Sequence, residues 1–191
     1  MSKLFIKQFI VILLIILAIF FIIFGSLLPL MKSRRFIHSL NSAQFIKTLG
    51  EFKENFDRPL KFYSPIGDEE IAKFLSGNIL SGIYQKEQPE AVARELVLYI
   101  EPYMFKNNVR HLLALGQMYS VLWQKSGRED DFIKAENYYQ KALSIGPKLP
   151  PLLYGMFDLY QLKGDKEKLR ETAGQILKYW PEDKKIEKYL N

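Results

Sequence analysis

Residues 9–31, FIVILLIILAIFFIIFGSLLPLM, decide how the rest of the chain can fold. The segment has no charged side chain, and its only side-chain polar group is the hydroxyl of Ser26. Its 23 residues would form a helix of about 34 Å, enough for a hydrocarbon core of about 30 Å. In lipid, only a helix satisfies all the backbone polar groups of such a segment internally. The pattern predicts a transmembrane helix from Phe9 to Met31, with the lipid bilayer as a partner.

Two other interpretations compete with a transmembrane anchor, namely a cleaved signal peptide and a buried core helix. The apolar core of a signal peptide is about 7–15 residues long and ends at small residues. This run is longer, and its only candidate cleavage site is the weak Ile23-Phe24-Gly25. A core helix would carry a polar stripe, and this segment has none. The sequence therefore favours an uncleaved anchor.

Basic residues flank the apolar segment on both sides. Residues 1–8 form a short basic leader with Lys3 and Lys7, while Lys32, Arg34 and Arg35 follow the segment. We expect the last three to lie at the membrane interface, with their charged ends among the lipid headgroups. Because the basic residues are almost balanced, the positive-inside rule does not choose an orientation.

The overall composition excludes several kinds of site. The chain has 27 Lys and Arg against 21 Asp and Glu in 191 residues, a formal charge of +6. This excess is spread out and forms no clustered basic stripe, so we expect no nucleic-acid partner. The chain has no cysteine, which excludes disulfides, thiol nucleophiles and thiolate metal sites.

After the anchor, apolar residues recur at spacings of three and four, which predicts an all-α chain without strands. Pro29 is expected to bend or end the first helix, and Gly50 to end the second. Because the loops are short, consecutive helices should be antiparallel neighbours. We expect degenerate helical hairpins over residues 32–106, and repeats with a C-terminal capping helix over residues 107–191. The helices are predicted at about 32–49, 51–62, 69–84, 89–105, 109–124, 130–144, 151–162, 166–179 and 182–190.

The C-terminal part contains two similar units. Pro147 and Pro181 are 34 residues apart, and each follows a tyrosine, a glycine and further apolar residues at comparable spacings. Tyr119 and Tyr160 are 41 residues apart, so the first unit has seven extra residues near 126–132. We expect them to lengthen its helices or the turn between them.

The first unit resembles the tetratricopeptide repeat, with Leu112 in the tryptophan position. The matching residues are Leu112, Leu115, Gly116, Tyr119, Gly127, Ala135, Tyr139, Ala142 and Pro147. In the second unit, Tyr160, Gly164 and Pro181 match, whereas Phe157 stands where glycine is usual. The resemblance implies helix pairs that stack into a solenoid, with the first helix of each pair lining a concave groove.

By helical spacing, seven residues of these first helices are expected to face the groove: Arg110, Leu113, Gln117, Ser120, Tyr154, Asp158 and Gln161. Grooves of this kind bind extended or helical peptides through polar clamps and apolar pockets. The expected partner is therefore a protein or peptide. The alternative is that these residues are simply the solvent-exposed face of their helices.

A fainter resemblance concerns the tail of O-antigen ligase/polymerase-type multispan membrane proteins. It rests on the apolar span, the basic residues and helix that follow, the stretch from Tyr63 to Ile71, and the repeats. The chain lacks the many spans in which the catalytic residues of that family lie. The resemblance implies an accessory or detached tail of a glycan assembly system in the cell envelope. It also implies a multispan enzyme as a partner and an extracytoplasmic position for the repeats.

No set of residues predicts catalysis. His38 and His111 have no second ligand at metal spacing, and we expect both at the surface. The acidic residues at 68–70 and 129–131 precede helices, where the helix dipole explains them. The sequence thus predicts no catalytic residue, metal or cofactor. We expect a single-pass, membrane-tethered, non-enzymatic scaffold or adaptor.

Overall fold

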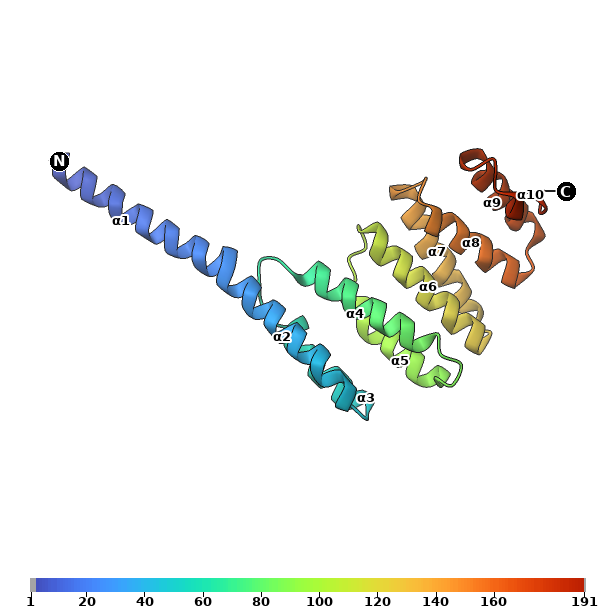
Figure 1. Cartoon of the computed structure of the whole chain (residues 1–191), viewed down its shortest axis with the longest axis horizontal. Coiled ribbons are helices and arrows are strands. Elements are labelled where there is room, and N and C mark those ends of the chain that lie inside the picture. Colours follow the sequence, from blue (N-terminus) through green and yellow to red (C-terminus); the bar gives the residue numbers. More distant parts are fainter. Residues whose placement is uncertain (1–2, 191) are drawn as a thin grey trace. The chain divides into compact units, whose positions relative to one another are not determined.

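The computed structural model describes residues 3–190, and the side chains of residues 7–190. Within this range the chain is helical and contains no strand, which confirms the predicted all-α class (Figure 1). The α-helices are α1 Lys3–Ile22, α2 Leu28–Ser42, α3 Leu49–Leu60, α4 Asp68–Ile83, α5 Glu90–Ile100, α6 Val109–Ser126, α7 Glu129–Ile145, α8 Pro150–Lys163, α9 Lys166–Tyr179 and α10 Lys184–Glu187. A π-helix covers Ile23–Leu27, and 3₁₀ turns cover Ala43–Phe45 and Glu101–Tyr103.

Internal contacts divide the chain into two compact units. Unit 1 is Met1–Ala72 and unit 2 is Lys73–Asn191, so the boundary falls inside α4. The predicted division into residues 32–106 and 107–191 concerns the type of repeat, and it stays a prediction.

One long helix begins the chain and continues well beyond its apolar part. From Lys7 to Phe45 it is uninterrupted for 39 residues, with a mean hydropathy of 3.3 in its most apolar stretch, none of which is buried. By length and composition it could cross a membrane, although a signal sequence near the N-terminus would share these features. Over residues 7–45, no loop separates the apolar helix from α2.

Pro29 does not end this helix, contrary to one of the two predicted outcomes. The turn before it is a π-helix, in which the Leu28 N–H donates to the Ile23 carbonyl. Such a wider turn accommodates residues that do not fit the regular hydrogen-bond ladder. Pro29 then lies in the first turn of α2, where proline is tolerated.

In unit 1, α3 packs against α2. The connection ends at Thr48, whose hydroxyl accepts from the Glu51 N–H at 3.2 Å while the Glu51 carboxylate accepts from the Thr48 N–H. This capping box starts α3 at Leu49. Gly50 therefore lies inside α3, which corrects the prediction that it ends the preceding helix. Phe36 from α2 and Phe56 from α3 are both buried, with their ring centroids 6.3 Å apart.

In unit 2, α6–α7 and α8–α9 form two helical hairpins (Figure 1). Each is joined by a two-residue turn that begins with a left-handed glycine, Gly127 with φ 68° and Gly164 with φ 76°. The first hairpin has helices of 18 and 17 residues, and the second has helices of 14 residues each. The seven extra residues of the first unit therefore lie in its helices and not in its turn.

Tyr139 of α7 occupies the junction between the two hairpins. A Cβ atom at Gly116 of α6 would lie 3.0 Å from its ring, and one at Gly155 of α8 would lie 2.8 Å from it. Both glycines therefore let a helix backbone approach the same buried ring. This close packing joins α6, α7 and α8.

The C-terminal helix is shorter than predicted. Instead of residues 182–190 it covers Lys184–Glu187, and Asp183 caps it by accepting from the N–H groups of Lys185 and Ile186. Ile186 is buried against Phe157 and Ile176. Together with the partly buried Tyr189 and Trp180, this side chain covers the apolar end of the last hairpin.

Candidate functional site

A hollow with a volume of about 290 Å³ opens between α6 and α8 in unit 2. We call it the polar hollow. It is lined by Tyr84, Gln117, Ser120, Gln124, Tyr139, Gly155, Asp158, Leu159, Gln161 and Leu162. Four of the seven residues predicted to face a groove are among them, namely Gln117, Ser120, Asp158 and Gln161.

The other three predicted groove residues do not line the polar hollow. Arg110 is exposed and Leu113 is half-buried, both on α6. Tyr154 contacts residues near the C-terminus of the chain. Its hydroxyl donates to the Asp183 carboxylate, and its ring centroid lies 6.1 Å from that of Trp180.

Sequence spacing missed several residues of the hollow. Gln124 lies one helical turn after Ser120, and Leu162 one turn after Asp158, so the same spacing could have found both. Tyr84 follows α4, far from α6 in sequence, and no local pattern predicts its position. Gly155 was missed because the repeat pattern places its glycine at the position of Phe157.

The floor of the polar hollow is rigid. Tyr139 is 2% exposed and is held between α6 and α8, and the buried Ser120 hydroxyl donates to the Gly116 carbonyl at 2.8 Å. Burial raises the pKa of the Tyr139 hydroxyl, which therefore stays protonated and can donate or accept a hydrogen bond.

Among the described residues that line the hollow, Asp158 alone is charged at neutral pH. Partial burial raises the pKa of this carboxyl. Burial and the nearby negative charge of Asp158 both raise the pKa of Tyr84. The hollow thus offers glutamine amides and hydroxyls around one carboxylate, groups suited to peptide N–H and C=O groups and to one cation.

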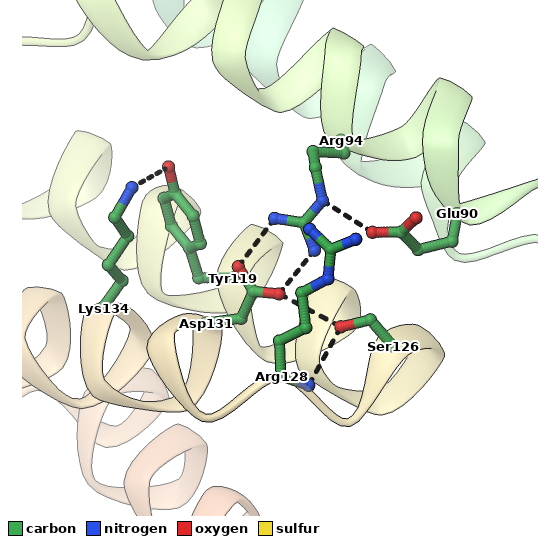
Figure 2. A network of polar contacts seen from close by, with 7 residues as sticks. All are labelled: Glu90, Arg94, Tyr119, Ser126, Arg128, Asp131 and Lys134. Carbon is green, nitrogen blue, oxygen red and sulfur yellow. Dashed lines mark hydrogen bonds and ion pairs between the residues drawn. The ribbon is translucent and has the colours of Figure 1, made fainter.

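A polar network fixes the helices beside the hollow (Figure 2). Arg94 of α5 donates to both carboxylate oxygens of Asp131 on α7, at 3.0 and 2.6 Å, and to Glu90 at 2.6 Å. Ser126 of α6 also donates to Asp131, at 3.1 Å. Burial raises the pKa of Asp131, but the bonds from Arg94 and Ser126 outweigh it and hold this pKa below its usual value. Three helices therefore meet at one ionised, largely buried carboxylate.

A second network surrounds Glu101, in the 3₁₀ turn after α5. Its carboxylate accepts hydrogen bonds from Tyr119, at 2.5 Å, and from Tyr138. Lys134 and Lys106 donate to these two hydroxyls in turn, at 3.2 and 3.1 Å. Burial raises the pKa of Glu101. The hydrogen bonds from the two phenols and the lysine charges lower this pKa by more, so the net shift is downward.

The two histidines differ from each other in burial. His38 is exposed, as predicted. His111 is 1% exposed, which corrects the prediction of a surface residue. Its Nδ1 accepts a hydrogen bond from the Phe105 N–H at 2.8 Å. This bond ties the segment before α6 to the first turn of that helix. Among the described residues, no group of three or more His, Asp and Glu could hold a metal ion.

Lys32 also differs from its expected role at the membrane interface. It is 1% exposed, and its Nζ donates to the Phe62 carbonyl at 2.7 Å and forms an ion pair with Asp68. The segment before α4 folds back over its aliphatic stem, a non-local contact that spacing along α2 does not reveal. Arg34 and Arg35 are exposed.

Comparisons with protein-family models, with curated proteins and with solved structures find no match to this chain.

Proposed function

We propose that the chain is a membrane-tethered, non-catalytic helical scaffold. Its repeats would bind an extended protein or peptide segment in the polar hollow. The interpretation as a tetratricopeptide-like solenoid belongs to this proposal, and two hairpins packed around Tyr139 support it.

The observation that carries the proposal is the chemistry of the polar hollow. Four side chains expected from helical spacing line it together with a rigid tyrosine floor. A volume of about 290 Å³ is near the lower end of ligand pockets, about 300–1,000 Å³, and suits one or two side chains. Asp158 at its rim favours a partner that inserts a lysine or arginine.

The tether would be the apolar helix from Phe9 to Met31. In the described chain its surface from Phe9 to Ile23 is exposed along the whole length, and such a surface needs lipid or another apolar environment. Tethering would raise the effective concentration of the partner at the membrane. Retention in membranes after carbonate extraction tests this part, and protease access in intact cells tests the proposed extracytoplasmic side.

The partner can be tested by site-specific photocrosslinking in native membranes. A photoreactive residue at Gln117 should crosslink to a defined peptide, whereas one at Gln175, exposed on α9 outside the hollow, should not. The recovered sequence is then synthesised and its affinity measured by fluorescence anisotropy. Asp158→Asn should weaken binding about tenfold, the effect of about 1.4 kcal/mol for a charged hydrogen bond, while Asp130→Asn should not. Equal crosslinking at both positions, or equal affinity of Asp158→Asn, would refute the peptide site.

A second candidate is a glycan-binding accessory of a cell-envelope polymerase or ligase. The observation that favours it is the exposed ring of Tyr84, which lies beside the amides and the carboxylate of the hollow. Saturation-transfer NMR with envelope glycan fragments tests it. A transfer signal that Tyr84→Ala abolishes would support this function over the peptide site.

A further inference from the structure

Unit 1 contains a second hollow, just beyond the apolar helix, that no part of the proposed scaffold function uses. Its volume is about 440 Å³, and it is lined by Arg34, Arg35, His38, Ser39 and Arg58. We call it the arginine hollow. Arg34, Arg35 and His38 come from α2, and Arg58 comes from the last turns of α3.

The fold itself brings Arg58 to the residues of α2. The connection from α2 to α3 reverses the chain, so the end of α3 returns toward the start of α2. The Ser39 hydroxyl donates to the Asn55 carbonyl and the Asn55 amide donates to the Ser39 carbonyl, both at 2.8 Å. Ser39 is 1% exposed. This reciprocal pair of bonds fixes α3 against α2 beside the hollow.

The charges around the arginine hollow are mostly positive. The described residues that line it include three arginines and no carboxylate. Arg58 forms an ion pair with Glu54, whose carboxylate lies 3.5 Å away. Both of these side chains are exposed, and such pairs contribute little. The Arg35 guanidinium lies over the Phe62 ring, 4.2 Å from its centroid. Stacking of this kind holds the plane of the guanidinium while its edge can still donate hydrogen bonds.

The hollow also lies at a particular depth along the helix. Arg34 is three residues past Met31 and His38 is seven, which places them about 4.5 and 10 Å beyond the end of the apolar run. The headgroup layer is about 5–7 Å thick on each side of a bilayer. The guanidinium groups would therefore lie at the level of lipid phosphates if the apolar helix spans the membrane.

We infer that the arginine hollow is a binding site for the phosphate of an anionic phospholipid. Guanidinium groups bind phosphate oxygens in pairs, and basic pockets beside membrane helices bind anionic headgroups. Lys32 takes no part, because it is buried in its ion pair with Asp68. The inference rests on the membrane span of the proposed function, but not on the polar hollow or its partner.

The test uses the full chain in a mild zwitterionic detergent and counts retained lipids by native mass spectrometry. Phosphatidylglycerol and phosphatidylcholine with the same acyl chains are offered in equal amounts. The wild type should retain phosphatidylglycerol in preference. The double variant Arg34→Gln and Arg58→Gln should weaken this retention about tenfold, an effect of about 1.4 kcal/mol. Arg170→Gln, an exposed arginine on α9, is the control and should leave it unchanged.

Three results would overturn the inference. These are equal retention of the two lipids by the wild type, an unchanged preference in the double variant, and displacement of phosphatidylglycerol by millimolar inorganic phosphate. The last result would mean that the hollow binds free phosphate and not a headgroup. Carbonate extraction tests the span separately, so a failed span and a failed lipid site can be distinguished.

Discussion

The close approach of α6 and α8 to Tyr139 predicts opposite effects for the same substitution at two helical glycines. At Gly155, an added methyl would lie 2.8 Å from a ring carbon of Tyr139, whereas at Gly174 of α9 it would meet nothing within 4 Å. The ring cannot move aside easily, because Gly116 is packed on it from α6. We therefore expect Gly155→Ala to destabilise unit 2 and Gly174→Ala to stabilise it.

The size of each effect follows from two terms. Replacing glycine by alanine inside a helix stabilises it by about 0.5–1 kcal/mol, and this term is common to both variants. Overpacking a buried site costs about 1–3 kcal/mol, and this term applies only to Gly155. Gly174→Ala should thus gain about 0.5–1 kcal/mol. The free energies of unfolding of the two variants should differ by about 1–3 kcal/mol, the steric term alone.

Tryptophan fluorescence during urea unfolding of the full chain in detergent measures these differences. The chain has two tryptophans, Trp123 and Trp180, and both lie in unit 2, so the signal does not depend on the apolar helix. In a Tyr139→Leu background, Gly155→Ala should lose most of its cost. If Gly155→Ala stabilises the protein as much as Gly174→Ala does, the proposed packing of α8 on Tyr139 is refuted.

Three further predictions concern the ion pairs. Asp131→Ala should lower the free energy of unfolding by about 2–3 kcal/mol because it leaves a partly buried arginine without its main partner, whereas the exposed Asp130→Ala should change it by less than about 0.5 kcal/mol. The pKa of Asp131 in the folded protein is below its ordinary 3.8. The difference in free energy of unfolding between wild type and Asp131→Ala should therefore be largest above about pH 4 and decrease as the pH falls below it. Urea titrations at several pH values measure this. Lys32→Gln should speed hydrogen exchange over residues 61–68, measured by mass spectrometry, without changing the retention of phosphatidylglycerol; unchanged exchange would contradict its structural role. Glu101→Gln should cost about 1–3 kcal/mol in the same urea assay, since the buried phenol of Tyr119 and the half-buried phenol of Tyr138 lose a charged acceptor, and a neutral result would refute the phenol network.

Local patterns in the sequence were sufficient to predict most of the helices. The range predicted for residues 166–179 is the observed α9, and α6 to α8 differ from their predicted ranges by at most two residues at either end. Capping and turn residues explain this agreement, because Asn108 and Asp165 accept hydrogen bonds from the first turns of their helices and the left-handed glycines end α6 and α8. Such signals act over a few residues, so they can be read along the chain.

The predictions that needed correction depended on contacts and backbone geometry that residue spacing does not show. Lys32 looked like one of three equivalent interface residues until Asp68, 36 residues later, was seen to pair with it. His111 looked exposed because its helix begins there, yet the Phe105 N–H binds it. Pro29 looked like a stop because the sequence does not show the π-helix before it.

The candidate site was partly predictable for the same reason. Helical spacing grouped Gln117, Ser120, Asp158 and Gln161, and these four residues line the polar hollow together. It could not bring in Tyr84, because that residue reaches the hollow only through the packing of unit 2. It also could not separate Tyr154 from the others, because the Asp183 carboxylate that binds this side chain lies 29 residues away.

The π-helix at Ile23–Leu27 determines how far the rest of unit 1 is rotated about the axis of the apolar helix. A π turn takes up one more residue per turn than a regular helix does, and each residue of an α-helix rotates its neighbours by about 100° about the axis. If the same residues formed a regular α-helix, the arginines of α2, and α3 packed on α2, would face a direction about 100° away around the helix axis. The five residues of this π-helix, which lie inside the apolar segment, therefore determine the direction around the helix axis in which the charged surface of α2 faces.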